Sequence, residues 1–157
     1  MIKSSHSIFT GAVLICLLLI CLSVGCTGTE AGTNTTQASP TLSGITLVEL
    51  YHFHGNQQCY SCKKLGEMAE DVANTYYPDE LASGKLIFCH INYQDPKNAE
   101  LVQMYEVSTS SLMIGVHTKD SFAKADIVQA WYCIDDKEEY EMVLCDIFDP
   151  LLKGDQS

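Results

Sequence analysis

The sequence predicts an α/β domain, and two observations support this class. Strand-like segments, at residues 45–54, 86–93 and 111–118, alternate with segments whose apolar residues recur at the helical period of 3.6. Strands that alternate with helices form βαβ units, in which the connected strands are parallel and the crossover is right-handed. We therefore expect one α/β domain over residues 45–157.

The first strand and the helix after it meet at a pair of thiols, in the segment Cys59-Tyr60-Ser61-Cys62. Residues 45–54 are rich in Val, Leu, Tyr and Phe, as in a strand. The helix is predicted over residues 59–76 and ends before Pro78, because apolar residues there keep helical spacing: Leu65, Met68, Ala69, Val72, Ala73 and Tyr76. The dithiol thus opens a helix, where the amides of the first turn stabilise a thiolate.

The middle of the domain continues the alternation. Residues 86–93 predict a second strand, whose apolar run suggests burial on both faces. Pro96 is placed to begin a short helix that runs to about residue 105, with Asp95 as its N-cap. Residues 111–118 predict a third strand.

The C-terminal part is predicted to be mainly helical. After a turn at Lys119-Asp120 and a short segment around Phe122, residues 127–133 suggest a helix. Residues 138–152 carry an apolar stripe and predict a longer helix. Pro150 should kink or end that helix, because proline lacks the N–H that the helix needs.

The N-terminus has the layout of a targeting or anchoring segment. Lys3 precedes an almost entirely apolar run over residues 8–24, as in the n-region and h-region of a secretory signal. A small residue directly before Cys26 resembles a lipoprotein signal, in which the cysteine is lipidated after cleavage. The alternatives are an uncleaved helix in the bilayer and simple secretion. We therefore assign residues 1–26 to a signal peptide or membrane anchor and expect an extracytoplasmic, membrane-anchored chain.

Residues 27–44 predict a flexible linker between this segment and the domain. They are mostly Gly, Thr, Ser, Ala, Asn and Gln, with too little apolar surface to fold. Asn34 begins an N-x-S/T triplet, which permits glycosylation in an extracytoplasmic linker. A match of this length is weak evidence by itself.

The charge of the chain argues against nucleic acid as a partner. The nine basic residues are all lysine, and the formal net charge is −11. Surfaces that bind phosphates usually recruit the forked guanidinium of arginine, which this chain lacks. The acidic balance fits a solvated outer face.

The cysteines do not form the pattern of a purely structural disulfide framework. Of eight cysteines, three lie in or at the end of the N-terminal apolar run and five lie in the domain. This odd number leaves room for a reactive pair, one bridge and a free thiol. Cys133 and Cys145 are the candidates for the bridge, and Cys89 is expected to be a small buried hydrophobe in the second strand.

Together these features resemble a divergent thioredoxin-like domain. The resemblance rests on a strand that ends in Phe53-His54, a Cys-x-x-Cys that opens a long helix, a second strand of Leu-Ile-Phe type, and Tyr105-x-Val107 before a third strand. It covers about residues 45–152, most of the mature chain. It implies a thioredoxin-like fold with a central mixed sheet flanked by helices, and a redox-active Cys59–Cys62 disulfide with no other cofactor.

The chain departs from the family pattern at three places. Gln58 precedes the first cysteine where thioredoxins have tryptophan, and Tyr60-Ser61 replaces Gly-Pro between the cysteines. Ser111 stands at the start of the third strand, where the family has a cis-proline that faces the dithiol, positions substrate and keeps metals away. The buried acid near the dithiol also has no match, since His52 and His54 hold the nearest strand positions.

These observations predict a thiol–disulfide oxidoreductase that acts on protein or small-molecule thiols and disulfides. Cys59 is expected to be the nucleophile, because a helix N-terminus commonly lowers a cysteine pKa from about 8.5 to roughly 3.5–7.5. Cys62 is expected to resolve the mixed disulfide. His52 or His54 is a candidate acid or base, since imidazole titrates near neutral pH.

Two other interpretations of these residues stay open. In one, the two cysteines form a structural bridge at the strand–helix corner. In the other, the chain is a non-catalytic module of the same fold that binds a protein partner or a metal. His52 and His54 share one face of a strand that leads to Cys59 and Cys62, and this set has the chemistry of a tetrahedral zinc or copper(I) site.

The remaining chemically notable residues are expected to be structural. His90 and His117 lie in predicted strands, and Trp131-Tyr132 is expected in the core. The two lysines after the motif, Lys63-Lys64, are expected to face solvent, although their charge would favour a thiolate nearby.

Overall fold

The structure is a computed structural model and describes residues 44–154. The predicted signal or anchor over residues 1–26, the linker up to residue 43, Cys26 and Asn34 lie outside the described residues. Within residues 44–154, no helix is long and apolar enough to cross a membrane.

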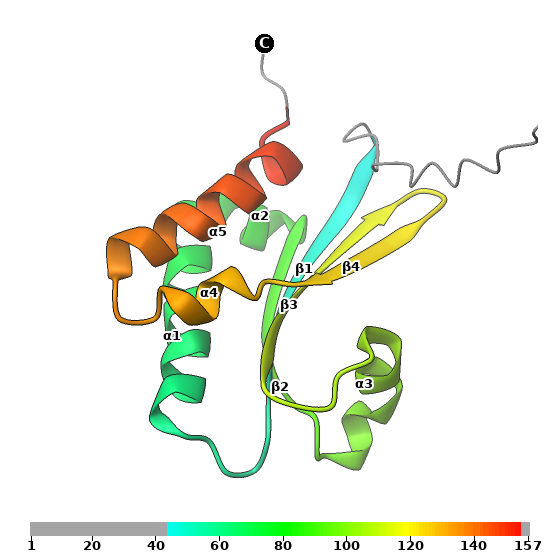
Figure 1. The fold of residues 1–157 in the computed structure, drawn as a ribbon. Coiled ribbons are helices and arrows are strands. Elements are labelled where there is room, and N and C mark those ends of the chain that lie inside the picture. The colour runs from blue at the N-terminus through cyan, green and yellow to red at the C-terminus, as the bar shows by residue number, and fades with distance from the viewer. Residues whose placement is uncertain (1–43, 155–157) are drawn as a thin grey trace, which may run out of the picture. The chain divides into compact units, whose positions relative to one another are not determined.

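Four strands form one mixed sheet in the order β2-β1-β3-β4 (Figure 1). β1 (Ile45–His54) pairs in parallel with β2 (Leu86–Asn92) and antiparallel with β3 (Ser111–Thr118). β4 (Phe122–Asp126) pairs antiparallel with β3. The parallel pair confirms the predicted βαβ unit, and the predicted bounds of the first and third strands are those observed.

Helices cover both faces of this sheet (Figure 1). α1, α4 and α5 lie on one face, and α3 lies on the other. Their bounds are α1 (Tyr60–Tyr76), α4 (Gln129–Tyr132), α5 (Lys137–Leu152) and α3 (Ala99–Tyr105). The chain therefore has the α/β class that the sequence predicts, with a mixed sheet between helices.

The predicted N-cap at Asp95 is confirmed. A 3-10 turn (Pro96–Asn98) precedes α3, and the side chain of Asp95 accepts a hydrogen bond from the Lys97 N–H there. Pro150 lies inside α5, which continues to Leu152, so the proline does not itself end the helix. It stands in the last turn, where few hydrogen bonds remain to be lost.

β1 separates the core into two clusters, because its alternate side chains point to opposite faces of the sheet. Val48 and Leu50 pack with α1 and α5 in the larger cluster. Tyr51 and Phe53 pack with Tyr105 of α3 in the smaller one. By the same alternation, even-numbered residues from Val48 to His54 face α1, and odd-numbered residues from Glu49 to Phe53 face α3.

The prediction that the second strand is buried on both faces is wrong. Only Leu86 of β2 is buried, while Cys89 and His90 are exposed, so Cys89 is not the buried hydrophobe that we expected. The reason is the strand order, which places β2 at an edge of the sheet. An edge strand leaves part of its side chains open to solvent even when its sequence is apolar.

A short helix that the sequence analysis missed follows α1. Pro78 ends the first helical pattern and also begins α2 (Pro78–Ser83). Its signals were present: proline at the first helical position, Asp79 and Glu80 in the first turn, and Gly84 at φ 74° after the last turn.

The prediction for the Trp131-Tyr132 pair is also partly wrong. Trp131 is half-buried against the larger core cluster, but 84% of Tyr132 is exposed. α4 is too short to bury two adjacent side chains, because neighbours in a helix point in directions about 100° apart.

Candidate dithiol site

Cys59 and Cys62 lie at the start of α1, where Cys59 is the N-cap residue. The Sγ atom of Cys59 accepts a hydrogen bond from the Cys62 N–H at 3.2 Å, and the two Sγ atoms are 2.6 Å apart. Both are free thiols; Cys59 is exposed and Cys62 is half-buried. The geometry therefore offers one accessible sulfur and a second sulfur directly behind it.

Hydrogen bonds lower the pKa of the Cys59 thiol below its ordinary value. The largest effect comes from the side chain of Cys62 and the next from its backbone N–H, while slight burial opposes them. Each donor stabilises the negative form. A larger share of Cys59 is therefore thiolate, the form that attacks a disulfide.

The loop that presents Cys59 is anchored to the end of β2. The Asn56 N–H donates to Oε1 of Gln94 at 2.6 Å, and Nδ2 of Asn92 donates to Oδ1 of Asn56 at 2.7 Å. A Cβ on Gly55 would come within 3.0 Å of the Tyr93 hydroxyl. A glycine at this position lets the loop turn closely past β2 and enter α1.

Tyr60, between the two cysteines, is 73% exposed. Nζ of Lys64 lies 5.6 Å from the centre of its ring and pairs with Asp135 at 2.9 Å. Lys64 is therefore half-buried rather than solvent-facing, whereas Lys63 is exposed as predicted. The dithiol is bordered on this side by an aromatic ring and an ion pair.

His52 lies in β1, on the face of the sheet that α1 covers, and is only 1% exposed. Its Nδ1 atom is 2.8 Å from Nδ1 of His90, and Nε2 of His90 is 3.3 Å from Oε2 of Glu70. A Cβ on Gly66 would fall 2.2 Å from Nδ1 of His52. The glycine inside α1 therefore makes the space that the imidazole occupies.

Burial lowers the pKa of His52 to about 4, and the imidazoles of His90 and His54 add to this lowering. A hydrogen-bonding interaction with the backbone of Cys62 has the opposite effect. A hydrogen bond from the charged ring to the Cys62 carbonyl would favour the protonated form in this way. Burial outweighs this effect, so neutral imidazole is the favoured form of His52.

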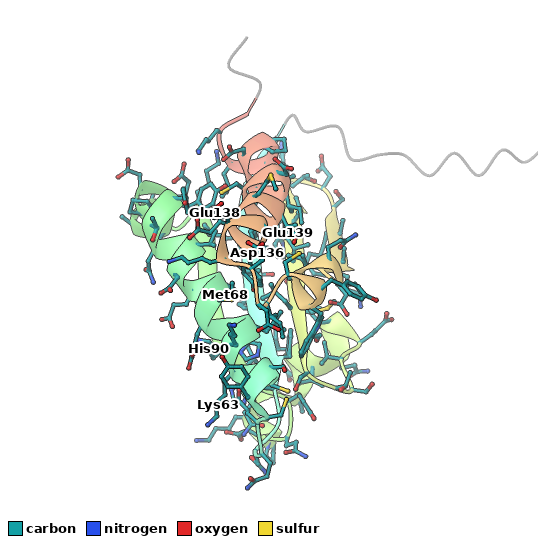
Figure 2. The ribbon with its side chains drawn as sticks, turned by 60° about the vertical axis from the view of Figure 1, so that its left-hand side comes forward. Lys63, Met68, His90, Asp136, Glu138 and Glu139 are labelled. Atoms are coloured by element: carbon teal, nitrogen blue, oxygen red, sulfur yellow. The ribbon has the colours of Figure 1, made fainter. Side chains whose placement is uncertain are left out.

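A pocket of about 450 Å³ opens next to these histidines, lined by His52, His54, Gln58, Lys63, Glu67, Glu70 and His90. Figure 2 shows Lys63 and His90 near the N-terminal part of α1. The lining combines imidazole, carboxylate and amine groups from β1, β2 and α1. It connects the buried His52 with solvent.

His54 is half-buried and lies nearer the loop. Its Nδ1 atom is 3.0 Å from the Gly55 carbonyl oxygen and 3.1 Å from Nε2 of Gln58. The first contact needs a proton on Nδ1 and the second needs a lone pair, so the two belong to different tautomers. Gln58, the residue directly before Cys59, thus contacts a histidine beside the dithiol.

Ser111 begins β3 and pairs with Phe53 near the end of β1. It is buried, and its Oγ donates to the Thr109 carbonyl at 3.4 Å. Residues 44–154 contain no cis peptide bond. The residue predicted to face the site therefore lies at the end of the sheet where β1 leads into the dithiol loop.

The four residues of the predicted metal alternative do not assemble into a ligand set. Nδ1 of His52 is engaged with His90 rather than turned toward the thiols. Over the described range, no three or more His, Cys, Asp and Glu side chains are grouped so that they could hold a metal ion.

The other described cysteines are free thiols as well. Cys133 is buried and donates to the Gln129 carbonyl at 3.3 Å, and Cys145 is half-buried in α5. The bridge between them that the sequence allowed is not formed. Burial also raises the pKa of the thiols of Cys89 and Cys133, which makes them poorer nucleophiles than Cys59.

A second polar cluster lies on the opposite face of the sheet. Oε2 of Glu49 accepts hydrogen bonds from Tyr105 at 2.6 Å and from His117 at 2.7 Å, and Oε1 accepts one from Tyr51 at 2.8 Å. His117 is therefore structural, as predicted. Glu49 was missed, because a lone acid in an apolar strand gives no sign of which face it will occupy.

Sequence reasoning also missed Glu67, Glu70 and the contact of His90 with His52. The available signal was the spacing of the two acids, three residues apart on one face of the predicted helix. What it could not supply was the register that sets His90 directly beside His52.

Comparisons with known proteins add little to this geometry. No family model matches the chain, and no curated protein matches it. A solved structure described as "Structure of a malarial protein" is 16% identical to this chain, with a TM-score of 0.35. The match covers 51% of this chain and 80% of the chain in that structure. This likeness supports no conclusion about the fold or the site.

Proposed function

We propose that this protein is a thiol–disulfide oxidoreductase that uses the Cys59/Cys62 dithiol. The observation that carries the proposal is the exposed Sγ of Cys59 at the N-cap of α1, 2.6 Å from the Sγ of Cys62. The lowered pKa of Cys59 supports its role as the attacking thiolate.

The reaction has two steps. The Cys59 thiolate attacks a disulfide, forms a mixed disulfide with one half of it, and releases the other half as a thiolate. The Cys62 thiol then loses its proton and attacks Sγ of Cys59, which releases the second thiolate and leaves a Cys59–Cys62 disulfide. The substrate disulfide gains two electrons and the protein dithiol loses them.

We further propose that the α/β domain is thioredoxin-like. Three placements support this: the dithiol opens the helix after β1, the sheet is mixed with helices on both faces, and Ser111 begins β3 opposite the end of β1. The missing cis-proline suggests that substrate is positioned differently from a typical thioredoxin.

The proposed place of action is outside the cytoplasm, at a membrane. This part of the proposal rests on the sequence of residues 1–44 alone. Mass spectrometry of the mature N-terminus tests it: a lipidated Cys26 is expected for a lipoprotein, and an unmodified chain that starts at Met1 would contradict lipidation.

Trapping of the mixed disulfide tests the proposed reaction. Cys62→Ser should accumulate a mixed disulfide on Cys59 when the reduced chain is mixed with glutathione disulfide, because the resolving thiol is absent. Cys59→Ser should form much less adduct at Cys62, which is half-buried. Cys89→Ser is the matched control for an exposed thiol and should behave like wild type; equal adduct formation in Cys59→Ser and Cys62→Ser would contradict the assigned roles.

The alternatives give different results in the same experiment. A purely structural bridge would form no adduct in the wild-type chain. A metal-binding module would retain metal when purified under reducing conditions, so metal analysis of that preparation separates this function from the redox one.

A further inference from the structure

We propose that the free edge of β2 pairs with the same edge of a second copy of this chain, so that the two sheets join and the two Cys89 thiols lie opposite each other. This inference does not depend on the redox function proposed above. Within residues 44–154, β2 pairs with β1 alone and has no strand at its other edge. A free edge offers a row of N–H and C=O groups to another strand.

The β2 edge lacks the features that keep edge strands apart. Residues 86–92 contain no Asp, Glu, Lys, Arg or Pro, whereas the strand at the opposite edge of the sheet, β4, carries Lys124 and Asp126. Charges and prolines on an edge strand oppose its pairing with another chain. Cys89 and His90 point to opposite faces of β2 and both are exposed, so the middle of this edge is open on both faces.

The hydrogen bonds to β1 determine which residues of β2 face the free edge. The Val48 N–H donates to the Lys85 carbonyl at 2.8 Å, and the Tyr93 N–H donates to the His54 carbonyl at 2.9 Å. Alternate residues of a strand in a parallel ladder bond to the same neighbour, so the odd-numbered residues of β2 bond to β1. The backbone groups that point to the free edge belong to the even-numbered residues Leu86, Phe88, His90 and Asn92.

One antiparallel register uses the full length of this edge in both copies. It sets Phe88 of each copy opposite His90 of the other, and each pair exchanges its N–H and C=O groups. The Asn92 carbonyl already accepts a hydrogen bond from the Asp95 N–H, so the pairing depends mainly on Phe88 and His90. Cys89 is the middle residue of β2, and in this register it stands directly opposite Cys89 of the partner subunit.

The same register brings aromatic side chains together beside the dithiol pocket. Phe88 and His90 lie on the face of the sheet that α1 covers, with their ring centres 4.9 Å apart. Phe88 of the partner subunit adds a second aromatic ring next to His90, and cross-strand aromatic pairs stabilise a sheet. Because His90 lines the pocket beside α1, the second copy contributes a side chain at the rim of that pocket.

Opposite Cys89 residues have the right spacing for a disulfide between the two chains. Directly opposite residues that are not hydrogen-bonded have Cα atoms about 4.5 Å apart, and disulfides join Cα atoms about 4.4–6.8 Å apart. Cys89 is a free, exposed thiol. The paired edges therefore form a site at which a small-molecule disulfide, such as glutathione disulfide, links the two copies.

The linking reaction is balanced by that oxidant. The Cys89 thiolate attacks glutathione disulfide, forms a mixed disulfide and releases one glutathione thiolate. Cys89 of the partner subunit then attacks Sγ of Cys89 and releases the second glutathione thiolate. The two Cys89 thiols lose two electrons and glutathione disulfide gains them, and the proton of each thiol passes to a released glutathione thiolate through water.

Disulfide mapping of the full chain tests the register. Cys59→Ser and Cys62→Ser are combined so that the dithiol takes no part, and the chain is treated with glutathione disulfide and digested without reduction. We expect mass spectrometry to find two copies of the Cys89 peptide joined to each other, which requires two chains. Ile91→Cys in a Cys89→Ser background is the matched control on the same face of β2. Its new thiol lies opposite residue 87, too far from its own copy to bond, so we expect about tenfold less self-linking.

Charges at position 89 test the pairing without a disulfide. Like charges directly opposite each other weaken a strand pair, and opposite charges stabilise it. Native mass spectrometry of the reduced full chain, in a mild detergent, measures the dimers. We expect fewer dimers from Cys89→Lys alone or Cys89→Glu alone than from Cys89→Ser. An equimolar mixture of the two charged variants should form about tenfold more heterodimer than either homodimer.

Three outcomes would overturn the proposed dimer. One is the absence of joined Cys89 peptides, which is also the result if another segment of the same chain covers the β2 edge. The second is equal self-linking in the Ile91→Cys control, which indicates random collision. The third is a mixture of the charged variants with no excess of heterodimer. None of these results bears on the Cys59/Cys62 reaction, which has its own test.

Discussion

His52 determines which residue can occupy position 66 of α1. Glycine inside a helix costs about 1 kcal/mol relative to alanine, yet here an added Cβ would lie 2.2 Å from the buried imidazole. The helix accepts the less favourable residue, and the imidazole packs against its backbone. One glycine therefore makes room for a histidine that lines the pocket beside α1.

Gly66→Ala should destabilise the domain by roughly 1–2 kcal/mol, because the cost of overpacking exceeds the gain in helix propensity. Urea denaturation measures the change in the free energy of unfolding. In a His52→Ala background the clash is absent, so the same substitution should be neutral or stabilising. An equal cost in both backgrounds would contradict the packing argument.

At the residue scale, the sequence identified the chemistry of the site better than its contacts. The positions of Cys59 and Cys62 at the helix start were predictable, because the period of the apolar residues changes there. The pairing of His52 with His90 was not, since it depends on the register between two parallel strands. His54 was predicted beside the dithiol, but its contact with Gln58 follows from the loop geometry.

At the element scale, Glu49 links β1, β3 and α3 by hydrogen bonds on the face of the sheet that α3 covers. Its carboxylate accepts hydrogen bonds from β1, from β3 and from α3 through Tyr51, His117 and Tyr105. A Cβ on Gly115 would meet the Tyr105 hydroxyl at 1.9 Å, so β3 also needs glycine there. Burial raises the pKa of Glu49, but these hydrogen bonds outweigh burial and leave its pKa below the ordinary value.

Glu49→Gln should therefore cost about 1.5–3 kcal/mol of stability at neutral pH, the usual range for hydrogen bonds to a charged group. In wild type, the unfolded state binds a proton at Glu49 before the folded state does, so stability should fall as pH drops below about 4.3. Chemical denaturation across pH should show a shallower fall in Glu49→Gln. Glu67→Gln, an exposed acid, should keep the wild-type slope; identical slopes in all three chains would contradict the role of Glu49.

The boundaries of helices and strands were predicted well where a clear periodicity of apolar residues ended at a capping or turn residue. β1, β3 and the cap at Asp95 follow from period and capping residues. Burial of β2 was predicted wrongly, because an apolar run does not reveal whether a strand is central or at an edge. That property depends on the strand order, which places β1 and not β2 between two neighbours.

At the scale of the whole domain, the fold gathers the site at one end of the sheet. β1 ends beside the dithiol loop, β2 brings His90 and the anchoring turn, and β3 begins at Ser111. The α/β class was predictable from alternating periods. The antiparallel pairing of β3 with β1 was expected only through the resemblance to a thioredoxin-like domain, since the sequence pattern by itself does not set strand direction.

A redox titration with thiol trapping tests the central claim most directly. The full chain is equilibrated in glutathione buffers of increasing potential, the thiols are alkylated, and the state of Cys59 and Cys62 is read by mass spectrometry. We predict that both thiols disappear together in one two-electron transition, with a tenfold change in the oxidised-to-reduced ratio for about every 30 mV. A pair that stays fully reduced, or fully oxidised, at every accessible potential would contradict a redox function for this dithiol.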